Sequence, residues 1–285
     1  MKRREFLLGA LAIPCLRAQS RVTDRIAVLD VGGANVLALS TGEGLVVVDS
    51  GPPKSAIGLP SPANVRILFN THYHPDQTGH NESFAAAGAK IIAHERTRQW
   101  LSSDYWVPAE DRYEKARPKA AWPTEVFETT GSWKVENEQI ECGYLLLAHT
   151  SGDIYVHFKN SNVLAVGDVA SPLRDPALDW YTGAWIGGRV DAMDVLLKLA
   201  DDQTKIVPAY GPIMSKAEFK AERDMMEEVR ARLFKLVREG DGPKEMLEQG
   251  ALNGLPRMWK DPAKFLYDAA KGLWAHHDKL DPNVV

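Results

Sequence analysis

Residues 70–81, with the sequence NTHYHPDQTGHN, contain three of the eight histidines of the chain. They follow the largely apolar segment 65–69, which predicts a buried strand. On an extended backbone His72 and His74 point to the same side, so both imidazoles can reach one metal ion. Asp76 adds a carboxylate that can serve as a ligand or a base. A polar loop after a strand is a common place for catalytic groups; the alternative is a surface turn whose histidines share no role.

The first 18 residues have the layout of an export signal. Lys2, Arg3 and Arg4 precede an apolar segment that ends near Ala18. The paired arginines resemble a twin-arginine signal, although the usual Ser or Thr before the pair is absent. The apolar segment is too short to span a bilayer. We therefore expect residues 1–18 to be cleaved and the protein to be periplasmic or secreted in a bacterium, without stable membrane insertion after processing.

Composition limits the possible functions. The chain has 285 residues, of which 45% are hydrophobic and 25% charged, as is usual for a soluble protein with one core. Cleavage after residue 18 removes four of the 34 basic and one of the 38 acidic residues, which leaves a net charge of −7. An acidic protein without a basic stripe is a poor candidate for binding nucleic acid. Cys142 would be the one remaining cysteine, so no internal disulfide is expected.

Residues 19–285 are predicted to fold as a single domain, in which residues 241–285 form a helical C-terminal extension. Apolar patterns predict strands at 25–31, 35–40, 44–49, 65–70, 90–93, 124–128, 132–136, 139–147, 153–158, 162–166 and 205–208. Helices are predicted at 80–88, 94–101, 189–200, 216–239, 243–248 and 262–276. Residues 102–123 show no clear period and are predicted to form a long loop. This loop either lies over the site or is a surface segment anchored by its aromatic residues.

Polar side chains follow several of the predicted strands. In chain order they are His72, His74, Asp76, His149, Asp168 and Tyr210. The ends of neighbouring strands can form one rim of a sheet, where such groups meet. Three imidazoles would hold a zinc ion and leave a fourth position for water. Zinc lowers the pKa of that water to about 7, which would provide hydroxide at neutral pH.

With these features the sequence resembles the metallo-β-lactamase superfamily. The matching motifs, spread in order over residues 25–215, are Asp49-Ser50-Gly51, residues 71–81, residues 149–153 and Gly167-Asp168. Residues 207–212 stand where the family commonly has a proline-glycine-histidine-glycine turn. The resemblance implies an α+β fold, a four-layer αββα sandwich with metal at one edge, followed here by a helical C-terminal tail. It also implies a first ion bound by His72, His74 and His149, and a second ion faced by Asp76 and Asp168.

Two departures from the family pattern affect the second ion. Gln77 replaces the histidine that commonly follows the motif aspartate, and Tyr210 replaces the late histidine. One zinc ion is therefore predicted at the three histidines, and a second is left open, with the Gln77 oxygen or the Tyr210 phenolate as substitute ligands. Tyr210 could instead donate a hydrogen bond to a developing oxyanion. Residues that could hydrogen-bond to the metal ligands and orient them are Asp49, Gln77 and His80. His80 could also replace a ligand or cap a helix.

The predicted function is that of a periplasmic zinc-dependent hydrolase. Metal-bound hydroxide, oriented by Asp76, would attack the carbonyl of an ester, thioester, lactone or amide. Fold alone does not reveal the substrate, but the aromatic residues of 102–123 and 176–188 favour a small, partly apolar molecule. The loss of two usual ligands of the second metal supports an alternative, a metal-binding accessory protein without hydrolytic turnover. Nothing in the sequence indicates the oligomeric state.

Overall fold

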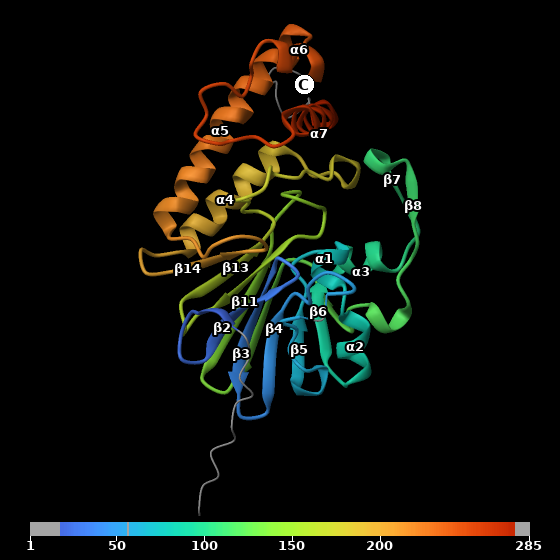
Figure 1. Cartoon of the computed structure of the whole chain (residues 1–285), viewed down its shortest axis with the longest axis vertical. Coiled ribbons are helices and arrows are strands. Elements are labelled where there is room, and N and C mark those ends of the chain that lie inside the picture. Colours follow the sequence, from blue (N-terminus) through green and yellow to red (C-terminus); the bar gives the residue numbers. More distant parts are fainter. Residues whose placement is uncertain (1–17, 56, 277–285) are drawn as a thin grey trace, which may run out of the picture.

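The structure of the protein is a computed structural model that describes residues 18–55 and 57–276. The predicted export signal lies outside the described residues except for Ala18, which begins a short strand, β1 (Ala18–Arg21). Within the described part, no helix is both long enough and apolar enough to cross a membrane. The chain builds two sheets, a small hairpin and the helices that cover them (Figure 1).

The first sheet carries the histidine-rich loop. Its seven strands lie in the order β1-β2-β3-β4-β5-β6-β9. After β1 these are β2 (Ile26–Val31), β3 (Ala34–Thr41), β4 (Gly44–Val48), β5 (Val65–Phe69), β6 (Lys90–His94) and β9 (Glu125–Phe127). Neighbours from β1 to β4 are antiparallel, whereas β4, β5, β6 and β9 run parallel. Since Val48 lies opposite Phe69, the residues that follow β4 and β5 meet at one edge.

The second sheet brings the later polar residues to the same edge. In spatial order it contains β10 (Thr130–Val135), β11 (Glu138–Tyr144), β12 (Ile154–Phe158), β13 (Val163–Gly167) and β14 (Lys205–Pro208). The strands β13 and β14 are parallel, with Gly167 opposite Pro208, so they end side by side. The two sheets touch at this edge, where the backbone N–H of Ile154 donates to the carbonyl oxygen of Thr71 over 2.9 Å.

Apolar side chains fill the space between the sheets. Val28, Leu37 and Phe69 from the first sheet pack in one buried cluster with Ile140 and Val156 from the second. Alternation along each strand sends these side chains inward and their neighbours to the opposite face. Burial of each such side chain contributes about 1.5–3 kcal/mol relative to its exposure in water. This core fixes the two sheets against each other and thereby the edge on which the polar residues lie.

Three helices of the described part lie beside the first sheet, and the first of them is part of the histidine-rich stretch. They are α1 (Pro75–Thr78), α2 (Asn81–Ala86) and α3 (Glu95–Leu101). Phe84 of α2 packs with Leu29 and Leu68 on the outer face of the sheet. Figure 1 shows α1 at the upper end of the strands, next to α3. The predicted helix 80–88 is α2, one residue later at its start and two residues shorter at its end, and a further short helix, α1, begins at Pro75 within the predicted loop.

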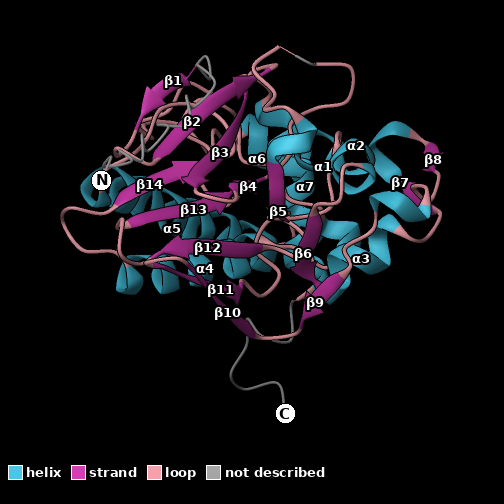
Figure 2. Ribbon diagram, turned by 90° about the horizontal axis from the view of Figure 1, so that it is seen from below, coloured by secondary structure: helices cyan, strands magenta, loops and turns pink. Residues whose placement is uncertain are grey.

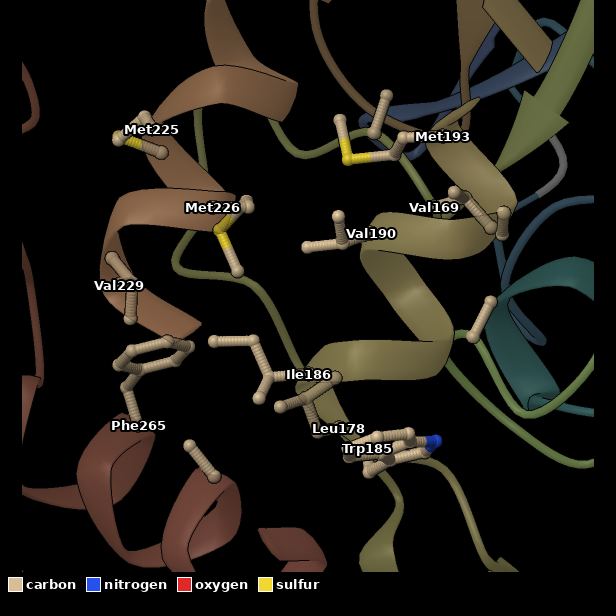
Figure 3. Packing of buried hydrophobic residues seen from close by; sticks show 14 of the residues in the cluster. Val169, Leu178, Trp185, Ile186, Val190, Met193, Met225, Met226, Val229 and Phe265 are labelled. Carbon is tan, nitrogen blue, oxygen red and sulfur yellow. The ribbon is translucent and has the colours of Figure 1, made fainter. Parts of the chain in front are cut away.

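The outer face of the second sheet is covered by α4 (Ile186–Leu199) and α5 (Lys216–Glu239). The helix α7 (Pro262–Ala275) packs on α4 and α5 farther from the strands, and α6 (Pro243–Glu248) packs on α7. A capping box of Ser215 and Glu218 begins α5, and Gly240 in a left-handed conformation ends it. Met226 of α5 faces Val190 of α4, with Phe265 of α7 nearby (Figure 3). With helices outside both sheets (Figure 2), the predicted α+β fold, a four-layer αββα sandwich with C-terminal helices, is confirmed.

Two predicted segments differ in the structure. Residues 102–123 contain a hairpin of β7 (Tyr105–Val107) and β8 (Arg112–Glu114) instead of an irregular loop, because three-residue strands are too short to show a period. The helix α4 begins at Ile186 rather than at 189. Glycine disfavours a helix by propensity, but a Cβ at Gly188 would lie 2.3 Å from the carbonyl oxygen of Leu147, so a tertiary contact requires glycine there.

Candidate metal centre

Three imidazoles from two loops converge at the edge where the sheets meet. His72 and His74 follow β5, and His149 lies in the connection between β11 and β12. The Nδ1 atom of His74 is 3.0 Å from Nε2 of His72 and 3.1 Å from Nε2 of His149. Among the described residues, these three side chains form a group whose ligand atoms lie close enough together to hold one metal ion. The structure thus brings together the three histidines that the sequence singled out.

The outer nitrogens of two of these rings face hydrogen-bond acceptors. Nε2 of His74 is 2.7 Å from Oδ2 of Asp179, and Nδ1 of His149 is 2.9 Å from the carbonyl oxygen of Ala177. Because a carboxylate or carbonyl oxygen can only accept, the ring nitrogen beside it carries the proton. In the neutral ring, the inner nitrogen then holds a lone pair that points at the centre of the group.

The ring of His72 is oriented through the threonine before it. Oγ1 of Thr71 donates to Oδ2 of Asp49 over 2.8 Å and lies 3.1 Å from Nδ1 of His72. Because the hydroxyl of Thr71 donates its hydrogen to Asp49, its oxygen can accept a hydrogen bond from Nδ1 of His72. The proton of the neutral His72 ring is then on Nδ1, and the lone pair is on Nε2. Asp49 also accepts from the backbone N–H of Thr71 over 2.8 Å. Asp49 therefore lies behind His72, the place for which the sequence made it a candidate.

The converging nitrogens fit a divalent cation. Zinc–nitrogen distances of about 2.0–2.1 Å in a tetrahedron put ligand atoms roughly 3.4 Å apart, close to the separations of 3.0 and 3.1 Å. Burial lowers the pKa of His72 and brings the pKa of His149 to about 4, so both rings are neutral at pH 7. Neutral imidazole is the form that binds a metal. Three protein ligands would leave a fourth position open.

Asp179 is a functional residue that sequence reasoning missed. Its Oδ2 accepts from the hydroxyls of Tyr73 at 2.6 Å and Tyr181 at 3.0 Å, besides its contact with His74. Burial opposes a charge on His74, but Asp179 raises the pKa of that ring to about 9. A metal ion therefore competes with a proton at Nδ1 of His74. The sequence indicated this role of Asp179 only weakly, as an acidic residue within the aromatic segment 176–188.

Replacing Asp179 with asparagine is expected to weaken metal binding about 10- to 100-fold, because the carboxylate fixes both the orientation and the proton of His74. Competition with a chelator of known affinity measures the change. Tyr181→Phe is the matched control, since it removes the longest of the contacts at 3.0 Å and keeps the carboxylate. Equal affinities in wild-type and D179N protein would contradict a positioning role for Asp179.

Asp76, Asp168 and Tyr210 lie beside the three histidines. Oδ2 of Asp168 is 3.6 Å from Nε2 of His72. The hydroxyl of Tyr210 donates a short hydrogen bond to Oδ2 of Asp76. Burial and the nearby Asp76 raise the pKa of Tyr210, so its hydroxyl stays protonated at neutral pH. The hydroxyl of Tyr210 is thus directed at Asp76, and the alternative in which its phenolate is a metal ligand stays a prediction. We call the place beside Asp76 and Asp168 the second position.

The two other sequence candidates lie outside the three-histidine group. Gln77 is buried, and its side-chain amide has no hydrogen-bond partner among the described residues. Nε2 of His80 is 3.1 Å from the carbonyl oxygen of Ser55. His80 is the residue before α2, but its side chain does not cap that helix. The structure thus gives His80 a contact with a neighbouring loop in place of the predicted cap.

A cavity of about 230 Å³ opens next to His74. Tyr105 from β7 lines one part of it, and Trp180 and Tyr181 line another, together with the charged side chains of Arg112, Glu114, Lys264 and Asp268. Residues of both aromatic segments, 102–123 and 176–188, therefore border the histidines. A larger cavity of about 500 Å³ between α5 and residues 256–260 includes none of the three histidines.

Comparison with known sequences gives the following relatives. A sequence profile of the metallo-beta-lactamase superfamily matches residues 29–211. The chain is 24% identical over 181 residues to the 2,4-dinitroanisole O-demethylase subunit alpha of Nocardioides sp. (strain JS1661). That match covers 62% of this chain and 49% of the relative, so the chain spans about half the length of the curated relative it matches.

Solved structures share the fold. A metallo-beta-lactamase family protein from Thermus thermophilus has a TM-score of 0.61 and 17% identity, over 86% of this chain and 89% of that chain. The stereoselective inverting sec-alkylsulfatase Pisa1 from Pseudomonas sp. has a TM-score of 0.63 and 13% identity, over 92% of this chain and 51% of that chain. At these identities the likeness concerns the fold and not the substrate.

Proposed function

Because the chain belongs to the metallo-β-lactamase superfamily and its histidines fit a divalent ion, we propose that it is a zinc-dependent hydrolase of small, partly apolar molecules. The observation that carries this proposal is the convergence of three imidazole nitrogens beside a cavity with aromatic walls. An ester, thioester, lactone or amide carbonyl is the group on which such a site would act. A carbonyl compound that enters the cavity reaches His74 directly.

Zinc at the three histidines would lower the pKa of bound water to about 7 and polarise a carbonyl oxygen. Asp76 lies on the helical turn directly after His74, and its carboxylate takes up the proton of the attacking water. Tyr210 holds this carboxylate in place through its hydrogen bond. Asp179 and Thr71 fix the rings of His74 and His72, so that the ligand atoms need no rearrangement.

A substrate panel tests the proposal. Zinc-loaded protein is assayed with aryl and alkyl esters, thioesters, lactones and β-lactams. Because relatives of this fold are named as an O-demethylase subunit and an alkylsulfatase, the panel also includes 2,4-dinitroanisole and a secondary alkyl sulfate. Turnover that requires zinc supports the hydrolase. Tight zinc binding without turnover of any compound would indicate the alternative, a metal-binding accessory protein.

Trp180→Ala should lower kcat/KM for an aryl ester about tenfold, because the loss of a large apolar wall removes roughly 1.4 kcal/mol or more of substrate burial. The effect on a methyl ester without an aromatic group should be much smaller. Trp106→Ala is the matched control, since Trp106 lies in the same hairpin as Tyr105 but does not line the cavity. Equal losses for both esters would assign Trp180 to stability rather than to substrate binding.

We also propose that the protein is exported, on the basis of the basic and apolar residues before Ala18. Expression of the full chain in a bacterium, followed by amino-terminal sequencing of the periplasmic fraction, is expected to give Gln19 as the first residue. Changing Arg3 and Arg4 to lysine should block export if the twin-arginine route is used. Recovery of the intact chain from the cytoplasm alone would refute the proposal.

A further inference from the structure

The second position has an excess of negative charge. The side chain of Asp168 is 15% exposed, its Oδ2 lies 3.6 Å from Nε2 of His72, and the carboxylate of Asp76 is close enough to repel it. When two neighbouring carboxylates such as those of Asp76 and Asp168 are both ionised, they repel each other unless a positive charge lies near both. The side chains of His74, Arg189 and Arg174 are close enough to attract the carboxylate of Asp168. Of these three, within the described part of the chain, Arg174 is the one that also approaches Asp76 as an ion pair.

Arg174 occupies this place through two contacts. Its guanidinium carbon lies 3.1 Å above the centre of the Tyr210 ring. Its Nη1 atom is 4.0 Å from Oδ2 of Asp76, the oxygen that also accepts the hydroxyl proton of Tyr210. A guanidinium on an aromatic face is attracted by the ring and keeps its hydrogen-bond donors free at its edges. One oxygen of Asp76 is thus engaged by both residues.

The backbone before Arg174 is held in place by buried side chains. Arg189 donates to the carbonyl oxygen of Asp168 over 2.8 Å and to Oγ of Ser171 over 2.9 Å. Arg257 donates to the carbonyl oxygens of Ser171, over 2.7 Å, and of Arg174. Both ends of the segment that carries Arg174 are therefore fixed, although the Arg174 side chain itself is half-exposed. These hydrogen bonds set the backbone position of Arg174, and the contacts with Tyr210 and Asp76 then orient its side chain.

We infer that the guanidinium of Arg174 is the resident cation of the second position, and that the protein therefore binds one metal ion, at the three histidines. The inference rests on the proposed zinc site and adds to it the reason for a single ion. It gives Tyr210 a role in a place where an imidazole is usual, since the aromatic face of Tyr210 binds the guanidinium and its hydroxyl holds Asp76. Arg174 acts here as a positioning residue for Asp76.

Metal counting tests the inference without reference to activity. Purified full-length protein is equilibrated with excess zinc, passed through a desalting column and analysed by mass spectrometry for zinc per chain, and titration calorimetry follows the binding steps. Wild-type protein should bind one equivalent. Arg174→Ala should bind a second, weaker equivalent, because Asp76 and Asp168 lose their positive partner. Arg174→Lys keeps a positive charge beside Asp76 and should bind one equivalent of zinc, like the wild type.

Arg66→Ala is the control for the loss of an arginine, because Arg66 donates to the carbonyl oxygens of Glu43 and Ala63, away from the histidines. Circular dichroism verifies that each variant is folded. Two equivalents in wild-type protein, or one equivalent in Arg174→Ala with a single binding step, would overturn the role of Arg174 while leaving the zinc hydrolase in place. A wild-type protein that binds no zinc would overturn both.

Discussion

Replacing His149 with alanine is expected to abolish stable metal binding and to lower hydrolytic turnover by about 10³-fold or more. His149 supplies one of three nitrogens that point at a common centre, and two ligands do not complete a zinc site. The loss of affinity should exceed the roughly 10- to 100-fold change expected when a group behind a ligand is removed. Zinc per chain after desalting and kcat/KM for the best substrate of the panel measure both effects.

His80→Ala is the matched control for this experiment. His80 is another histidine near the same loop, but its contact is with the carbonyl oxygen of Ser55 and it does not belong to the three-histidine group. The metal content of H80A protein should equal that of the wild type. A bound ion stabilises the native state, and a chelator removes that contribution. A chelator should therefore lower the melting temperature of wild-type and H80A protein, which bind the ion, but not that of H149A protein, which does not. Normal metal content in H149A would refute the site.

The strands and the histidines could be predicted because their signals are local. The segment 65–69 is apolar over most of its length, as a strand covered on both faces requires, and the structure places β5 there. His72 and His74 then follow from the alternation of an extended chain. The partnership with His149, 75 residues further on, is not local. The place of His149 in the site could be predicted only from the order of motifs that the chain shares with the superfamily. The structure explains this partnership, because the strand ends of the two sheets meet at one edge.

The residues that sequence reasoning missed lie in segments without a period. Asp179 is 105 residues from His74 and precedes a short turn at Trp180–Thr182, so nothing in its neighbourhood indicates a ligand contact. Arg174 lies between β13 and α4, where the backbone is set by buried side chains from α4 and from the segment before α7. Such positions depend on tertiary contacts, and neither propensity nor alternation encodes them.

Glu222→Leu is expected to destabilise the protein by about 3–5 kcal/mol, because it removes the carboxylate partner of a fully buried arginine. Oε1 of Glu222 lies 3.8 Å from Arg189 and 3.5 Å from Arg257, and it accepts the backbone N–H of Ser171 over 2.7 Å. The side chain of Arg189 is 0% exposed, so its charge cannot turn to water. Urea unfolding followed by circular dichroism measures the change in the free energy of unfolding.

The double variant Arg189→Met/Glu222→Leu decides what this buried pair does. Removing both charges eliminates the fully buried cation of Arg189 and leaves only Arg257, which is 10% exposed, without its carboxylate partner, so the double variant should be more stable than Glu222→Leu alone. It should nevertheless lose turnover, because the carbonyl of Asp168 and the hydroxyl of Ser171 lose their donor, and Arg257 alone then holds the segment that carries Arg174. Stability that recovers without turnover would show that the pair is retained to position the site. A double variant less stable than Glu222→Leu alone would mean that the pair itself holds the fold.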